Sequence, residues 1–435
     1  MGTGLSVIIQ GDVVLAGMTD ERVGAKMTAN LLIPFLTSST GALLVVRGRQ
    51  EAALARWPTM TRTHRGVDDG QVDDLPRHVD VLVIGAGQAG LGVAYWLGKH
   101  PELSVLVVDA LPVGESWVQR WDSLQLFTPR RFSALPGLRF PSGATRAPSR
   151  LEMAAYLRTY AEKLELPVRT GVDVRHVARV ADGFVAQTGG GPVRAKHLVI
   201  ATGPFRQPYV PAAGDDLDAS VTQLHSLHYR RPSDIPAGEV LIVGGGNSAA
   251  QLAIELAGSH TVTIASPGPL WFLPEDILGA SMYWWTLLSG VLNAKADSWL
   301  SRYVRRRGDA IVGQELRALI REGQVRLLPH RVLAGQGREL ELADGTAVPV
   351  ASVLWCTGFR PATSWLEVDG ALDPTGAPVH DQGASPVPGL HWMGLPWQTR
   401  LNSSIIDGVD RDARCTVRRI VAASQTAGAP KVRGS

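Results

Sequence analysis

The sequence predicts an α/β protein with two Rossmann-like parallel-sheet units and an N-terminal extension. One observation is a repeated order of strand, glycine-rich turn, helix and second strand, at residues 78–109 and again at 239–265. Another is that strands such as 79–84 and 240–243 are nearly continuous apolar runs, which is typical of strands buried on both faces of a parallel sheet. A chain of 435 residues is also long enough for two or three domains.

The stretch 78–109 has the pattern of a dinucleotide-binding unit. Gly85 permits the tight turn out of the strand, Gly87 lets the backbone approach a pyrophosphate, and Gly90 lets the helix pack against the sheet. Asp109 ends the second strand, where its carboxylate can accept hydrogen bonds from a ribose diol. The alternative, a glycine-rich turn without a ligand, leaves this combination of strands, helix and acid unexplained.

Residues 239–250 repeat the pattern of 80–91, with Ala249 in place of the third glycine, a substitution that this fingerprint tolerates. Ser266 stands at the end of the second strand, where the first unit has Asp109. A carboxylate there would repel a 2′-phosphate, whereas a serine can donate a hydrogen bond to it, so we expect this unit to prefer NADPH over NADH. The alternative is a duplicated fold that has lost its ligand.

The composition excludes several classes of protein. An apolar content of 45% and a charged content of 19% suit a globular chain, and a net charge of +3 gives no reason to expect nucleic acid as a partner. The only cysteines, Cys356 and Cys415, form no C-x-x-C pair, which argues against a disulfide framework, a zinc site and a dithiol redox centre; the sequence also shows no metal-ligand cluster. We therefore expect a reduced, cytoplasmic setting, and Cys356 is expected to be a small buried residue.

Residues 1–77 do not share the pattern of the rest and are expected to form a poorly ordered extension. Their apolar runs are too short for a membrane span, and acidic residues interrupt what would otherwise be a weak secretory signal. Translation from Met27 or Met60 is a further alternative. We expect a protein without residues 1–59 to fold and to bind its cofactor.

Two other segments stand out. The loop 114–129 carries two tryptophans and an arginine beyond the end of a strand, where open parallel sheets bind ligands; the alternative is a packed loop that covers the sheet. The insertion 269–307 carries four tryptophans. It is expected to form a lid or tunnel for an apolar substrate, a contact with a membrane surface or a second subunit, or packing within the monomer.

Two dinucleotide sites without other reactive groups favour redox chemistry. A protein that holds a flavin against a nicotinamide can leave hydride transfer and oxygen activation to the cofactors and contribute orientation and a dry pocket.

Several motifs together resemble the flavin-containing monooxygenase family, and in particular a bacterial branch labelled as flavoproteins of potassium transport. The resemblance covers residues 78–425. Its motifs are GAGQAG at 85–90, GESWVQRWDSLQLFTP at 114–129, ATG at 201–203, QLHSLHYRRP at 223–232, GGGNSAAQLA at 244–253, CTGF at 356–359, GLHWMGLPW at 389–397 and GVDRDA at 408–413.

The resemblance implies FAD in the first unit and NADPH in the second. It implies a discontinuous FAD domain (78–208 and 333–425), an inserted NAD(P)H domain (209–332) and a flexible tail (426–435). The cofactor-binding residues expected are Gly85, Gly87, Gln88, Ala89, Gly90, Asp109, Ala110, Trp117, Arg120, Trp121, Leu126, Val174, Ala201, Thr202, Gly203, Gly244, Gly246, Asn247, Ser248, Ala249, Ser266, Thr357 and Gly358.

The resemblance also implies an activity. Flavin reduced by NADPH would capture oxygen as a C4a-(hydro)peroxide and oxygenate a small organic substrate. The alternatives are an NAD(P)H-dependent flavin reductase or oxidase that releases hydrogen peroxide, and a non-catalytic flavin redox sensor attached to a transporter.

The chain departs from the family pattern at two places. In the fingerprint F-x-G-x-x-x-H-x-x-x-aromatic, His225 and Tyr229 match, but Ala219 and Val221 replace the first aromatic residue and the glycine. Phe127 stands where many members have an asparagine. We therefore assign no catalytic side chain, and we expect His225 to be a structural hydrogen-bonding residue.

Overall fold

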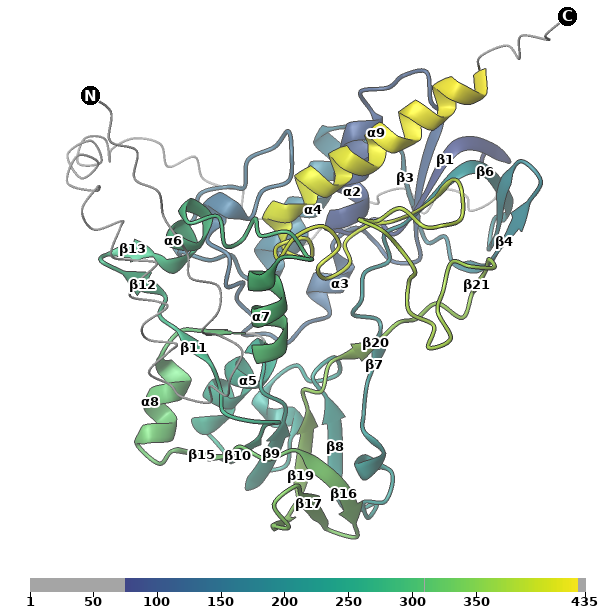
Figure 1. Cartoon of the computed structure of the whole chain (residues 1–435). Helices are drawn as coiled ribbons and strands as arrows, with labels where there is room; N and C mark the ends of the chain where they lie inside the picture. The colour runs from purple at the N-terminus through teal and green to yellow at the C-terminus, as the bar shows by residue number, and fades with distance from the viewer. Residues whose placement is uncertain (1–74, 309, 429–435) are drawn as a thin grey trace, which may run out of the picture. The chain divides into compact units, whose positions relative to one another are not determined.

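The computed structural model describes residues 75–308 and 310–428 (Figure 1). The expectations for residues 1–74 and for the tail beyond 428 lie outside this part of the chain. Among the described residues, no helix is both long enough and apolar enough to span a bilayer.

The larger sheet is organised around the first predicted strand, β1, which runs parallel to β2 and β6. Its strand order is β21-β4-β5-β6-β1-β2-β3, and β22 also pairs with β6. Because Val83 lies opposite both Val107 and Val199, the carboxyl ends of these three strands meet at one edge. The strands are β1 (His78–Ile84), β2 (Val105–Asp109), β3 (Val168–Thr170), β4 (Val174–Val180), β5 (Gly183–Thr188), β6 (Gly191–Ile200), β21 (Leu366–Glu367) and β22 (Leu390–Trp392).

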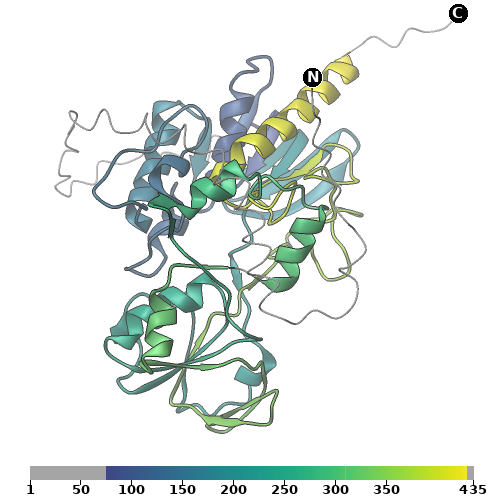
Figure 2. The same cartoon turned by 60° about the vertical axis from the view of Figure 1, so that its left-hand side comes forward.

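Three helices cover one face of this sheet: α2 (Gln88–Leu97), α4 (Arg150–Lys163) and α9 (Val409–Gly428). Figures 1 and 2 show the long helix α9 running beside α2. The two helices approach closely because Gly92 has no side chain; a Cβ there would lie 2.4 Å from Val409 Cγ1. Helix α4 begins with the capping box of Ser149 and Glu152. On the opposite face, residues of β1 and β2 form a second core together with buried residues of β4 and β5.

The second sheet is parallel throughout, with the strand order β15-β10-β9-β19-β8. Successive residues of β9 point to opposite faces: Val240 and Ile242 pack with the helices, and Leu241 and Val243 with a small antiparallel sheet. The elements are β8 (Thr222–His225), β9 (Glu239–Val243), α5 (Asn247–Ala257), β10 (Thr261–Ala265), α8 (Glu315–Arg321), β15 (Val325–Leu328), β16 (Val332–Gln336), β17 (Glu339–Leu342), β18 (Ala347–Pro349) and β19 (Ser352–Trp355).

The predicted return to the first unit at residue 333 is too early. Strand β19 pairs with β9 and β8, so the second unit continues to Trp355. The chain crosses back beside the outgoing connection, where β20 (Phe359–Arg360) pairs with β7 (Gln207–Pro208). A short apolar strand fits either sheet equally well, which is why its pattern did not reveal its partner. The α/β fold with an inserted second unit is otherwise as predicted.

The insertion is partly packed and partly exposed. Phe132 lies 4.8 Å, between ring centroids, from both Tyr283 and Trp284. This part of the insertion therefore packs within the chain, whereas Trp299 is 58% exposed. The elements of the insertion and of its return are β11 (Phe272–Leu273), β12 (Asp276–Ile277), β13 (Ala280–Ser281), α6 (Met282–Leu288), α7 (Trp299–Arg307) and β14 (Ile311–Val312).

Candidate functional site

The three glycines after β1 have different surroundings. A Cβ at Gly85 would lie 2.4 Å from the carbonyl oxygen of Ala201, and one at Gly90 would lie 1.8 Å from that of Gly85. A Cβ at Gly87 would meet no heavy atom within 4 Å. Two glycines therefore close the turn, and the third leaves the backbone open to a ligand.

The open glycine stands at the positive end of a helix. Gly87 is the N-cap of α2, whose first turn has neither a side-chain cap nor an acidic residue. Such an end has free N–H groups and a favourable dipole for an anion. Asp109 lies beside it and accepts hydrogen bonds from the backbone N–H groups of Ala86, at 2.8 Å, and Leu111, at 3.0 Å. Together the loop and the carboxylate fit the diphosphate and ribose of a dinucleotide.

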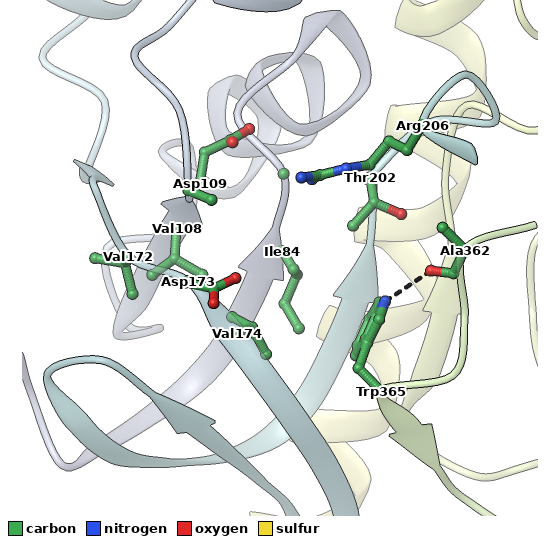
Figure 3. A pocket seen from close by; sticks show the side chains of 12 residues that line it. Ile84, Val108, Asp109, Val172, Asp173, Val174, Thr202, Arg206, Ala362 and Trp365 are labelled. Carbon is green, nitrogen blue, oxygen red and sulfur yellow. Dashed lines mark hydrogen bonds between the residues drawn. The ribbon is translucent and has the colours of Figure 1, made fainter. Parts of the chain in front are cut away.

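A pocket opens at this edge of the sheet (Figure 3). It brings together five of the predicted residues: Gly85, Asp109, Ala110, Val174 and Thr202. It also contains residues that the sequence did not single out: Ile84, Val108, Val172, Asp173, Arg206, Ala362 and Trp365. Figure 3 shows Asp109 and Arg206 reaching the loop after β1 from opposite sides. Of these seven residues, only Asp173 could have been predicted from the sequence, because it follows the end of a strand.

The predicted aromatic loop, residues 114–129, contacts Phe205 and Phe359 through Arg120. Trp121 is 5% exposed, and its indole Nε1 is buried without a hydrogen-bond partner among the described residues. The guanidinium carbon of Arg120 lies 5.8 Å from the ring centre of Phe205 and 5.7 Å from that of Phe359. Burial, followed by the nearby charge of Arg230, lowers the pKa of Arg120. An unpaired buried donor and a cation between aromatic rings are groups that a bound polar ligand can satisfy.

Other predicted residues of the first unit have structural partners. The side-chain amide of Gln88 donates to the carbonyl oxygen of Ser404 at 3.2 Å, so it faces the C-terminal segment. The hydroxyl of Thr357 donates to the carbonyl oxygen of Tyr209. Leu126 is buried in the core, and Trp117 packs at its border.

The second glycine loop is built like the first. Gly244 has φ +144°, and a Cβ there would lie 2.4 Å from the carbonyl oxygen of Cys356. Gly246 is the N-cap of α5, which also lacks a side-chain cap and an acidic first turn. The side chain of Asn247 is turned to the returning end of the insertion: its Nδ2 donates to the carbonyl oxygen of Ala310 at 2.9 Å. This helix end is therefore also suited to a diphosphate.

Ser266 does not have the geometry that the sequence suggested. It is 1% exposed, and its hydroxyl donates to the carbonyl oxygen of Gly268. In this arrangement the hydroxyl hydrogen cannot be donated to a 2′-phosphate, because the tight turn after β10 folds back over the side chain. A preference for NADPH must come from another residue.

His225 is a structural hydrogen-bonding residue, as expected. Its Nδ1 accepts from the backbone N–H of Leu227 at 3.1 Å, so its Nε2 carries the proton and donates to the carbonyl oxygen of Gly358 at 3.0 Å. Burial lowers the pKa of His225, which keeps the ring neutral.

The cysteines are not arranged for dithiol chemistry. Both Cys356 and Cys415 are free, and burial raises the pKa of the Cys356 thiol to about 12. A thiol with so high a pKa is a poor nucleophile at neutral pH.

Asp407 is a buried carboxyl in the segment that reaches α2. One of its oxygens accepts from Asn402 Nδ2 at 3.2 Å, and the carboxyl also interacts with the buried hydroxyl of Tyr283. Burial raises the pKa of Asp407 above its ordinary value of 3.8. The folded protein therefore binds this proton more tightly than the unfolded chain, and its contribution to stability is lost as the pH rises through the raised pKa.

We expect Asp407→Asn to stabilise the protein by an amount that grows with pH. The amide is neutral at every pH, so the difference in melting temperature from the unmodified protein should be small near pH 4 and reach a few degrees by pH 8. Thermal unfolding of the flavin-loaded proteins across this range measures it. The same difference at all pH values would show that Asp407 does not titrate in this way.

The similarity of this chain to known proteins agrees with this architecture. Residues 82–281 match the family model described as pyridine nucleotide-disulphide oxidoreductase. An uncharacterized CzcO-like oxidoreductase of Geobacillus kaustophilus is 39% identical over 79% of this chain and 98% of that protein. A flavin-containing monooxygenase from Stenotrophomonas maltophilia superposes with a TM-score of 0.68, at 30% identity, over 80% of this chain and 100% of that one. A probable indole-3-pyruvate monooxygenase of Arabidopsis thaliana, YUCCA9, is 26% identical over 72% of this chain and 81% of that protein.

Two glycine loops, each leading into an uncapped helix on its own parallel sheet, define a pyridine-nucleotide-dependent flavoprotein oxidoreductase. The chain belongs to the flavin-containing monooxygenase family. It is an FAD-dependent oxidoreductase.

Proposed function

We propose that this protein is an NADPH- and oxygen-dependent monooxygenase that inserts one oxygen atom into a small organic substrate. The observation that carries the proposal is the pair of dinucleotide sites in a chain without a redox dithiol. Its only two cysteines are free, and the thiol of Cys356 stays protonated at neutral pH. Electrons from NADPH that reach the flavin must therefore pass to an external acceptor, and oxygen is the acceptor used by monooxygenases.

The reaction balances with the cofactors that the family uses. NADPH, one proton, oxygen and the substrate give NADP⁺, water and the oxygenated substrate. When bound, the flavin serves as the electron carrier between NADPH and oxygen. The residues of this chain hold and orient the reactants and exclude water.

We assign the FAD diphosphate to the N-terminus of α2 at Gly87, and the FAD ribose to Asp109. The open backbone at Gly87 and the orientation of the Asp109 carboxylate support this assignment. We assign the NADPH diphosphate to the N-terminus of α5 at Gly246, which is likewise uncapped. The other predicted cofactor residues remain proposals of the same kind, apart from Ser266, whose hydroxyl has another partner.

Rapid mixing tests the proposal directly. Flavin-loaded protein is reduced with NADPH under anaerobic conditions and then mixed with oxygen. We expect reduction by NADPH, followed by a long-lived peroxyflavin absorbance that decays faster when substrate is added. Prompt reoxidation with one hydrogen peroxide per NADPH would instead show an oxidase, and failure of NADPH to reduce the flavin would show a redox sensor.

A substrate panel then defines the chemistry. The panel contains thioethers, amines, ketones, aryl 2-oxo acids and organoarsenicals, and the product formed is compared with the NADPH consumed. The relative that is a probable indole-3-pyruvate monooxygenase supports including the aryl 2-oxo acids. A substrate that raises product to nearly one per NADPH identifies the class.

A further inference from the structure

The two ends of the insertion lie together beside the second glycine loop. Strand β11 pairs with β14, and the backbone N–H of Ile311 donates to the carbonyl oxygen of Trp271 at 2.8 Å. Asn247, the first residue of α5, holds the same place through Ala310 and through the backbone N–H of Val312, which donates to Asn247 Oδ1 at 3.2 Å. Trp271 and Ala310 are thus close to the proposed NADPH diphosphate site.

The loop that follows β10 covers this glycine loop. A Cβ at Gly245 would lie 3.3 Å from both Ser266 Cβ and Leu270 Cδ2. In this kind of unit, the end of the second strand faces the ribose whose 2′-oxygen carries the extra phosphate of NADPH. The side chain at that end, Ser266, is buried and donates to Gly268, so it leaves the phosphate without a partner.

Arg307 contacts the segment that follows Ser266. Its guanidinium carbon is 5.2 Å from the ring centre of Trp271, which follows Ser266 by one short loop. The side chain is exposed, and no carboxylate of the described residues forms an ion pair with it. An arginine that rests on an indole is held in place while its N–H groups stay available for a phosphate.

We propose that Arg307 binds the 2′-phosphate of NADPH and that Trp271 positions it. The proposal rests on the assignment of NADPH to the second unit. The last helix of the insertion, α7, would then supply the selectivity for NADPH that the end of β10 lacks. Two other arginines of α7 have other partners: Arg305 lies over Trp397, at 4.8 Å, and Arg302 donates to the carbonyl oxygen of Asp297.

Binding of nucleotide fragments to the flavin-loaded protein tests the proposal without turnover. Calorimetry measures the affinity for 2′,5′-ADP, which carries the 2′-phosphate, and for 5′-AMP, which does not. We expect Arg307→Gln to weaken 2′,5′-ADP binding by about tenfold to a hundredfold, as for a lost charged hydrogen bond, and to leave 5′-AMP binding unchanged. Arg307→Lys keeps the charge without the planar fork. Its affinity for 2′,5′-ADP should therefore lie between that of the unmodified protein and that of Arg307→Gln.

Arg306→Gln is the matched control, because it removes the same charge from the adjacent exposed position of α7. It should leave both affinities within about twofold, since an exposed charge outside the contact is screened by salt. Equal weakening of both ligands by Arg307→Gln, or an equal effect of the two substitutions, would overturn the role of Arg307. If the unmodified protein itself binds 2′,5′-ADP no better than 5′-AMP, the assignment of NADPH fails instead.

Discussion

Gly87→Val is expected to prevent FAD binding while the protein stays folded. The backbone of Gly87, with φ −77° and ψ −173°, is one that any residue adopts, and a Cβ there meets no protein atom within 4 Å. The valine side chain would instead occupy the space over the N-terminus of α2 that we assign to the diphosphate. We expect the dissociation constant for FAD to rise by at least about 100-fold, or about 2.7 kcal/mol.

Titration of the flavin-free protein with FAD measures this change by flavin fluorescence. The control is Gly98→Ala at the other end of the same helix, where φ is −62° and a Cβ would lie 3.4 Å from the carbonyl oxygen of Ala94. It should bind FAD normally. Undiminished FAD affinity in Gly87→Val, with the fold confirmed by circular dichroism, would exclude this loop as the flavin diphosphate site.

Gly244→Val should separate the two cofactors. At φ +144° and 2.4 Å from the carbonyl oxygen of Cys356, a side chain forces the second loop to move, at a cost of about 1–3 kcal/mol in backbone strain alone. The displaced loop can no longer present the N-terminus of α5 to a diphosphate. We expect the flavin to remain bound and to be reduced by dithionite, while reduction by NADPH slows by at least about 100-fold.

Anaerobic stopped-flow reduction measures both rates in the same preparation. Gly258→Ala, at the C-terminal end of α5 with φ −72° and a Cβ 3.8 Å from the carbonyl oxygen of Glu255, is the control and should be reduced by NADPH at the normal rate. If Gly244→Val loses both the bound flavin and the reduction by NADPH, the second loop supports the whole fold. Full NADPH reduction in Gly244→Val would place the reductant elsewhere.

The local patterns of the sequence predicted much of this protein. The two glycine loops, the helices behind them and the carboxylate of Asp109 lie where their spacing indicated. These features depend on backbone conformation and on contacts between neighbouring elements, for which residue type is decisive: only glycine fits where Gly85 meets Ala201 and where Gly244 meets Cys356. The structural role of His225 was also predicted and agrees with its two backbone partners.

Tertiary structure decided what depends on residues that are distant in the sequence. It placed β19 in the second sheet, turned the Ser266 hydroxyl toward Gly268, and brought Arg206 and Trp365 to the pocket beside Asp109. It also returned the end of the insertion to Trp271, so that Arg307 lies over the ring of Trp271. Spacing along the chain determines which loops can bind a diphosphate, because that site is built from consecutive residues. Which side chains surround the rest of the cofactor is determined only by how the insertion and the two sheets pack, since those contacts join segments that share no local pattern.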